Sequence, residues 1–250
     1  MTSVFRIAIL ECDNTPSSIS DTQGSYGDIV ERFLRRGFEQ TASQTPKLEV
    51  TKWNVLQSQS YPRLTEIDGL FLTAGKYSAY DDYPWAFKLI DFLKEAYHAR
   101  IPIAAICYGH QILARALGGK VLKNPKGSEL SVTRVDLTAC GAALFETDHL
   151  NLYQMHLDTV VDAPPGMEVI GSSARSSVQL LYEPGRILGI QGHPEANPFQ
   201  IKEYLHSRFA ENLISADVYE EALSKVHDKQ DGDAFSAALP KFFVSNHRAS

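Results

Sequence analysis

The stretch IPIAAICYGHQILARALGGK, residues 101–120, joins a short apolar strand to a helix at a single cysteine. The apolar run 101–107 predicts a buried strand of a parallel sheet, and the pattern HQILARAL predicts a helix that begins within about two residues of Cys107. Ligands of open sheets of this kind bind beyond the carboxyl ends of the strands. A residue at this strand-to-helix turn therefore faces the ligand crevice, as in a nucleophile elbow.

Strands and helices alternate through the first half of the chain. Residues 12–25 are mostly polar and predict a loop. The apolar stripe of 27–42 predicts a helix, and Pro84 suits the first turn of another. Further β-rich apolar runs predict strands at 4–11, 48–55 and 68–75. This alternation is typical of an α/β fold with a doubly wound, mostly parallel sheet.

Short β-like runs follow Gly119, and they predict an antiparallel extension of the sheet. Towards the C-terminus the pattern is helical again, with predicted helices at 198–214, 216–228 and 234–245. No internal repeat, low-complexity segment or linker divides the sequence. We therefore expect one domain over 1–250, with a core at about 4–200 and a helical C-terminal part at about 198–250.

The composition argues against several classes of partner. The 250 residues carry a net charge of −6 and no basic run beyond Arg35-Arg36, so no electrostatic footprint for nucleic acid or an anionic membrane is present. No apolar run approaches the roughly 20 residues of a membrane span, and the N-terminus lacks the apolar stretch of a signal peptide. Three cysteines without a CxxC motif predict unpaired thiols in a reducing compartment, and hence a cytoplasmic location. No spaced cluster of His, Cys or Asp predicts a metal site, and no cofactor is expected.

Cys107 has two interpretations. Unpaired cysteines are among the most buried residues, so a structural thiol at the end of the strand is the simpler one. Gly109, however, removes a side chain where backbone must pass close by. The N–H groups at the helix N-terminus would also favour a thiolate and could stabilise an oxyanion. The choice between the two depends on whether a base is present.

A second strand end supplies a histidine. The segment RILGIQGHPEAN, residues 186–197, places His193 just beyond an apolar run, where it can face the same crevice as Cys107. Glu195 is near enough in sequence to accept the other imidazole N–H, and Pro194 stiffens the turn between them. Alone, His-Pro-Glu is compatible with an exposed turn. Together with Cys107, it indicates a Cys-His-Glu catalytic triad.

The two motifs together resemble those of a known family. Cys-Tyr-Gly-His-Gln at 107–111 and Gly-His-Pro-Glu at 192–195 are similar to the triad motifs of class I glutamine amidotransferases. The resemblance covers most of residues 4–200 and includes the stretches 73–85, 117–127 and 155–158. Within the family, the sequence most resembles stand-alone GMP-synthase-like proteins, including the plant γ-glutamyl peptidases and their fungal counterparts. This resemblance implies a flavodoxin-like fold and a thiol-dependent reaction.

The resemblance implies a role for each residue of the triad. Cys107 would attack a γ-glutamyl carbonyl, and His193 would take the thiol proton and return it to the leaving group. Glu195 would orient His193. A γ-glutamyl thioester would form on the cysteine, and water would hydrolyse it.

The same resemblance implies a set of substrate-binding residues. Backbone N–H groups at Tyr108 and in the loop of Gly75 and Lys76 would hold the oxyanion, although this loop departs from the Gly-Gly-Pro of ammonia-delivering relatives. Side chains near the glutamyl group are implied at Gln111, Glu129, His156 and Asp158. The alternative for these four is an ordinary structural role, on a helix face or in a satisfied network at a strand end.

Three functions are compatible with these residues. The first is a cysteine-dependent hydrolase of γ-glutamyl amide bonds, acting on γ-glutamyl peptides or glutathione-type conjugates. It is favoured because the sequence has neither a P-loop motif nor the length for an ATP-pyrophosphatase domain. The second is a glutaminase that delivers ammonia from glutamine to a separate synthase. The third is a non-catalytic scaffold of the same fold. The expected partners are a small γ-glutamyl substrate and either a synthase or a second copy of the chain.

Overall fold

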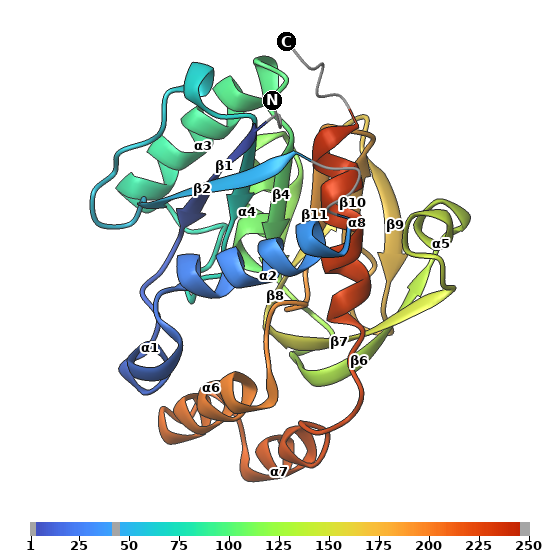
Figure 1. Ribbon diagram of the computed structural model, residues 1–250. Coiled ribbons are helices and arrows are strands. Elements are labelled where there is room, and N and C mark those ends of the chain that lie inside the picture. The colour runs from blue at the N-terminus through green and yellow to red at the C-terminus, as the bar shows by residue number, and fades with distance from the viewer. Residues whose placement is uncertain (1–3, 42–45, 246–250) are drawn as a thin grey trace.

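A nine-stranded mixed sheet forms the centre of the protein (Figure 1). The computed structural model describes residues 4–41 and 46–245. In sheet order, the strands are β2 (Lys47–Asn54), β1 (Val4–Glu11), β3 (Gly69–Leu72), β4 (Ile103–Ile106), β11 (Ile187–Ile190), β10 (Leu180–Glu183), β9 (Glu168–Ser172), β6 (Glu129–Leu137) and β7 (His149–His156). Neighbours from β2 to β11 pair in parallel, and those from β11 to β7 pair antiparallel. The predicted doubly wound, mostly parallel sheet with an antiparallel extension is therefore confirmed.

Helices cover both faces of this sheet (Figure 1). One face carries α2 (Tyr26–Gln40) and α8 (Gly232–Val244), and the other carries α3 (Pro84–His98) and α4 (Tyr108–Ala116). Phe5 and Ile7 of β1 pack in the core with α2 and α8, whereas Ala8 and Leu10 pack with α3 and α4. Because successive strand residues point to opposite faces, a strand covered on both sides has to be apolar on both, which is why β1 is a nearly continuous apolar run.

The C-terminal third of the chain adds helices at the edge of the sheet. The helix α6 (Pro198–Ala210) and the helix α7 (Ala216–Ser224) form a small core of their own with Tyr153 and Met155 of β7. The last helix, α8, instead runs back along the sheet beside α2 (Figure 1). The three helices predicted near the C-terminus are thus present, each ending within a few residues of its expected limits. No helix in the described part of the chain has the length and apolar character needed to cross a bilayer.

Three elements differ from the sequence-based prediction. The predicted loop 12–25 contains a short helix, α1 (Ser17–Gln23), in which Ile19 is the buried residue. A second short helix, α5 (Ala139–Phe145), interrupts the short β-like runs predicted after Gly119. The strand β8 (Asp158–Asp162) pairs with β5 (Lys120–Lys123) in a separate two-stranded sheet instead of extending the main one. Each of these segments is short and its apolar pattern gives only a weak periodic signal, so tertiary packing decides its structure.

Two neighbouring parallel strands, β4 and β11, position the candidate site. Ile106 and Ile190 end the two strands directly opposite each other. Every residue of both strands is buried, as expected for the middle of a parallel sheet. The residues that follow, Cys107 and Gln191, therefore leave the sheet at the same edge. The Cys107 N–H then donates to the Ile190 carbonyl at 2.8 Å, which ties the two strand ends together.

Candidate active site

Cys107 stands on a strained turn between β4 and α4. Its backbone has φ 48° and ψ −111°, a conformation that residues other than glycine rarely adopt. The bond from its own N–H to Ile190 and the bond from the Gln111 N–H to its carbonyl, at 3.0 Å, hold the turn in place. Strain of this kind costs on the order of 1–3 kcal/mol and persists where the surrounding structure enforces it, most often at functional sites. The side chain is buried at the foot of the helix, with 5% of the residue exposed.

Gly109 allows the start of α4 to lie directly against the end of β3. A Cβ at this position would stand 2.7 Å from the Leu72 Cβ and 2.9 Å from the Leu72 and Thr73 carbonyl oxygens. The Gly109 N–H also donates to the Thr73 carbonyl at 3.2 Å. The glycine in this motif is therefore required by close packing and not by its φ angle. The contact brings the loop after β3, which contains Gly75, next to the cysteine turn.

His193 lies three residues beyond the end of β11 and is held by Glu195. The distance from His193 Nδ1 to Glu195 Oε1 is 2.9 Å, and the two side chains are 6% and 5% exposed. A carboxylate can only accept, so Nδ1 carries a proton and the other nitrogen, Nε2, is directed elsewhere. The His193 N–H donates to the Tyr153 carbonyl at 2.8 Å, which bends the segment back over β7.

The electrostatic environment of His193 favours the imidazolium. Burial alone would lower its pKa, but the charges of Cys107 and Glu195, with hydrogen bonding to both, outweigh burial and raise the pKa to about 10. Within the described residues, Nε2 has no hydrogen bond of good geometry, so its contact with the Cys107 sulfur is loose. Such contacts in unliganded sites often tighten when substrate binds. The arrangement can hold an imidazolium beside the Cys107 sulfur at neutral pH.

The expected oxyanion donors are only partly available for that role. Gly75 lies against the elbow, because a Cβ there would be 3.4 Å from the Tyr108 Cγ. The N–H groups of Gly75 and Tyr108 donate to no acceptor in residues 4–41 and 46–245. The Lys76 N–H, by contrast, donates to Asp13 Oδ2 at 2.9 Å, and the Lys76 side chain is 74% exposed with Nζ 4.0 Å from Asp13 Oδ1. Asp13 is the residue that fixes the loop, so the Lys76 N–H is occupied, and the oxyanion role of Gly75 stays a prediction.

Gln111 and Asp158 are in contact on the side of Cys107 away from the Gly75 loop. The Gln111 Nε2 donates to the Asp158 carbonyl at 2.8 Å and to Gln191 Oε1 at 3.0 Å. Both amide hydrogens are therefore used, and the Gln111 Oε1 is left as an acceptor. Burial raises the pKa of the Asp158 carboxyl, while hydrogen bonds from Ser78 and Tyr80 partly offset this increase. The two residues expected near a glutamyl group are thus close together in space.

Glu129 and His156 form a buried ion pair beneath this region. The His156 Nε2 lies 3.1 Å from Glu129 Oε2, and its Nδ1 lies 2.9 Å from the Asp158 carbonyl oxygen. Both partners are acceptors, so both ring nitrogens carry protons. Ser173 Oγ donates to Glu129 Oε1 at 2.6 Å, and Gln179 Nε2 donates to Glu129 Oε2 at 2.8 Å. These contacts leave His156 no donor for a substrate, in accord with the alternative of a satisfied network at a strand end.

The sequence did not single out three buried glutamines of this network, Gln154, Gln179 and Gln191. Gln154 Nε2 donates to Gln179 Oε1 at 3.1 Å, and Gln191 accepts from Gln111 as described above. All three are buried, although glutamine is mostly an exposed residue. The available signal was their position inside or at the end of apolar strand runs, in NLYQMH, SVQLLYE and LGIQGH. A polar residue in such a run has to find hydrogen-bond partners, and neighbouring strands supply them here.

Replacing Glu129 with glutamine should destabilise the protein by about 3 kcal/mol, because it leaves a buried imidazolium without its counter-charge. For a chain of this size, that corresponds to a fall in Tm of roughly 6–12 °C. Burial would raise the pKa of Glu129, but hydrogen bonds from His156 and Ser173 outweigh burial and lower it from 4.5. Its stabilising effect is thus present above that pH and is lost as acid protonates the carboxylate. Thermal unfolding of both proteins at pH 7 and near pH 4 should show that the difference in their Tm values is smaller in acid. A difference that is larger in acid would contradict the ion pair.

His110 and the other two cysteines do not belong to this reactive arrangement. His110 is fully buried against β11, where a Cβ on Gly189 would be 2.6 Å from its Nδ1. Burial is the main reason that the pKa of His110 is lowered to about 3, so the ring is neutral. Burial likewise raises the thiol pKa of Cys12 and, less strongly, that of Cys140. Within the described ranges, no group of three His, Cys, Asp or Glu side chains is arranged to hold a metal ion.

Comparison with known proteins identifies the family. The family model for "Glutamine amidotransferase class-I" matches residues 26–212. The chain belongs to the class I glutamine amidotransferase family. A glutamine amidotransferase-like protein of Schizosaccharomyces pombe is 33% identical to this chain over 245 residues. The match covers 96% of this chain and 99% of that protein. Gamma-glutamyl peptidase 2 of Arabidopsis thaliana is 25% identical over 209 residues, or 80% of this chain and 84% of that protein.

The fold of this class I amidotransferase is also found in solved structures. The crystal structure of a glutamine amidotransferase from Thermotoga maritima superposes on this chain with a TM-score of 0.72 and 19% sequence identity. The superposition covers 96% of this chain and 98% of that one. Members of the family are typically hydrolytic enzymes. The matched range 26–212 contains Cys107, His193 and Glu195, whereas Asp13 lies outside it.

Proposed function

We propose that this class I amidotransferase is a cysteine-dependent hydrolase of γ-glutamyl amide bonds that works through a γ-glutamyl thioester. The observation that carries the proposal is the buried His193, whose Nδ1 lies 2.9 Å from Glu195 Oε1 and whose raised pKa reflects the neighbouring charges of Cys107 and Glu195. The likeness to gamma-glutamyl peptidase 2 supports γ-glutamyl as the acyl group. We propose γ-glutamyl peptides or glutathione-type conjugates as its substrates.

In the acylation half-reaction, the Cys107 thiolate attacks the γ-carbonyl carbon and an S–C bond forms. The negative charge that develops on the carbonyl oxygen is stabilised by the N–H groups of Gly75 and Tyr108, neither of which is used elsewhere in the described chain. The C–N bond then breaks, and the amine leaves with the proton that His193 supplies from Nε2. Because the imidazolium forms before substrate binds, this proton is present when the amine needs it.

In the deacylation half-reaction, the now neutral His193 takes a proton from water as the water oxygen attacks the thioester carbonyl. The S–C bond breaks, glutamate is released, and the thiolate–imidazolium pair is restored. Glu195 keeps the His193 ring in one orientation and one tautomer through both steps, because its Oε1 accepts from Nδ1. On the acyl side, the unused Gln111 Oε1 would accept from the α-ammonium of the glutamyl group.

The proposal is tested by mass spectrometry of the intact protein. Wild type and Cys107→Ser are incubated with glutamine, glutathione, a glutathione S-conjugate and a γ-glutamyl dipeptide, quenched in acid and weighed, and the released amine is quantified. We expect a γ-glutamyl adduct on Cys107 of the wild type, together with release of glutamate from at least one amide. Equal behaviour of the two proteins on every substrate would overturn the proposal and favour a non-catalytic scaffold.

The same experiment separates hydrolysis of γ-glutamyl amides from delivery of ammonia. A glutaminase subunit would hydrolyse glutamine and leave γ-glutamyl peptides intact, and a synthase partner would stimulate it. The Gly75 loop lacks the Gly-Gly-Pro of ammonia-delivering relatives, an observation that favours the peptides. Turnover of glutamine alone would replace the first function with the second.

A further inference from the structure

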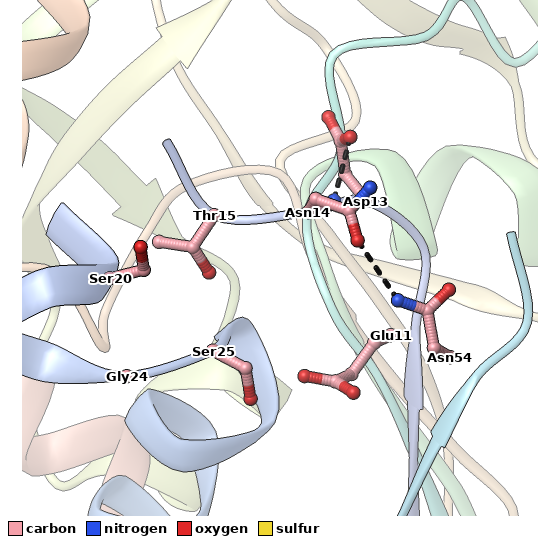
Figure 2. Close-up of a pocket in the computed structure, with 8 residues that line it drawn as sticks. All are labelled: Glu11, Asp13, Asn14, Thr15, Ser20, Gly24, Ser25 and Asn54. Carbon is pink, nitrogen blue, oxygen red and sulfur yellow. Dashed lines mark hydrogen bonds between the residues drawn. The ribbon is translucent and has the colours of Figure 1, made fainter. Parts of the chain in front are cut away.

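A pocket opens at the end of β1, at the same edge of the sheet as the candidate active site (Figure 2). It has a volume of about 340 Å³ and is formed by the ends of β1 and β2 and by the segment that leads from α1 into α2. Glu11, Thr15, Ser25 and Asn54 are among its lining residues. It is not part of the site described above, although Asp13 borders both.

The pocket adjoins the candidate active site on the side away from Gln111. Along the sheet, β1 lies next to β3, and β3 lies next to β4, which delivers Cys107. Asp13, in the pocket wall, accepts the Lys76 N–H and so holds the loop of Gly75 beside the elbow. Next to the lining residue Gly24, the Gln23 Oε1 accepts from Asn197 Nδ2 at 3.1 Å, which joins α1 to the segment after Glu195. The two sites thus share walls.

This placement assigns the pocket to the leaving group. The inference rests on the proposed function: the carbonyl carbon of a γ-glutamyl amide carries the glutamyl chain on one side and the amine on the other. With the glutamyl chain against Gln111 and Asp158, which meet on the β11 side of Cys107, the amine extends towards β3 and β1. Ammonia, the leaving group of glutamine, is too small to reach the pocket, whereas a longer amine enters it.

The pocket contains a buried carboxylate that lacks a counter-charge. Glu11 is 8% exposed, and its Oε1 accepts the Gly27 N–H at 2.7 Å. Within the described residues, its Oε2 accepts no hydrogen bond and no lysine or arginine forms an ion pair with it. Figure 2 shows the carboxylate pointing away from β1 towards Ser25. Lys52, which lies nearby, is already paired with Asp28 and Glu31.

The pocket also contains a hydroxyl group without a hydrogen-bond partner. The Thr15 Oγ1 is buried, and it forms no hydrogen bond within the part of the chain that the structure describes. Buried carboxylates without a counter-charge and buried hydroxyls without a hydrogen bond are costly, and natural proteins keep few of them. A bound cation would compensate Glu11, and its remaining N–H groups could donate to the hydroxyl oxygen of Thr15.

We propose that this pocket binds a positively charged group on the leaving amine. The preferred substrates are then γ-glutamyl amides of amines that carry a second ammonium or guanidinium, such as a diamine or a basic amino acid. Anionic leaving groups are disfavoured by the charge of Glu11. Within the proposed substrates, the inference favours γ-glutamyl peptides with a basic leaving residue over glutathione and its conjugates, whose leaving dipeptide ends in a carboxylate.

Three γ-glutamyl amides of nearly equal length test this preference: those of 1,4-diaminobutane, n-butylamine and 4-aminobutanoate, which leave as cationic, neutral and anionic amines. We expect the wild-type kcat/KM to be at least about tenfold higher for the cationic amide than for the neutral one, the effect of one hydrogen bond between charged groups. The anionic amide should be the slowest of the three.

Glu11→Gln keeps an acceptor for the Gly27 N–H but removes the charge. We expect it to bring the kcat/KM values of the cationic and neutral amides to within about twofold of each other. Thr15→Lys, on a partly exposed loop, provides a second variant, because a tethered ammonium in the pocket should also abolish the preference. Glu39→Gln, at an exposed position of α2 outside the pocket lining, is the matched control and should retain the preference.

The outcomes separate the two proposals. Equal kcat/KM for the three amides in the wild type, or a preference that survives in both Glu11→Gln and Thr15→Lys, would overturn the assignment of the pocket and leave the hydrolase intact. Failure of the wild type on all amides and on glutamine would overturn the proposed function, and the pocket assignment would fall with it.

Discussion

Cys107→Ala is expected to lower kcat for γ-glutamyl amide hydrolysis by at least about 10⁴-fold. Loss of the nucleophile alone abolishes almost all catalysis in triad enzymes, since the remaining groups cannot form the covalent intermediate. What persists is the small contribution of the oxyanion donors and of substrate binding. The rate is measured as glutamate released under saturating substrate, with the most reactive amide of the panel.

The matched control for this substitution is Cys140→Ala. Cys140 is partly exposed and lies far along the chain, so its removal should leave kcat unchanged. Alanine at 107 also retains a Cβ at the strained φ of 48°, and the protein should therefore unfold at nearly the wild-type temperature. A Cys107→Ala protein that keeps its fold and more than about one hundredth of the activity would show that this thiol is not the nucleophile.

The local features of the fold could be predicted from the sequence because each is encoded within a few residues. Val4–Glu11 and Ile103–Ile106 are strands because their apolar runs are short and bounded by turns. The turn at Cys107 follows from a strand that ends at Ile106 and a helix that begins at Tyr108. The adjacency of β4 and β11 is not encoded in this way. It was predictable through the resemblance of the two motifs to one family, and the register of Ile106 with Ile190 then explains it.

The partners of polar groups could not be predicted, because they are set by contacts between distant segments. The Lys76 N–H bonds to Asp13, 63 residues away, so sequence alone could not show that this donor is taken. Glu129 and His156 are opposite each other on β6 and β7, a register that residue spacing does not specify. The pocket containing Glu11 is likewise built from the ends of two strands and an unpredicted helix.

Glu195→Gln is expected to lower kcat/KM by about 10³–10⁴-fold although the substitution is isosteric. The Glu195 carboxylate accepts from His193 Nδ1, but an amide can donate there instead and select the tautomer with its proton on Nε2. Nε2, the nitrogen directed away from Glu195, would then carry a proton and could not accept one from the thiol. Glu203→Gln, at an ordinary position on α6, is the matched control and should retain full activity.

The pH dependence gives a second readout for the same variant. The charges of Cys107 and Glu195 overcome burial and raise the pKa of His193 to about 10, so the imidazolium is present below that pH and is lost above it. Wild-type kcat/KM should therefore stay level across neutral pH and decline as the pH passes about 10. In Glu195→Gln one of the two stabilising charges is absent, and the alkaline decline should move to lower pH. Initial rates from pH 6 to 11 measure both curves. If the residual activity of Glu195→Gln declines at the wild-type pH, Glu195 does not set the protonation of His193, and the loss of rate needs another cause.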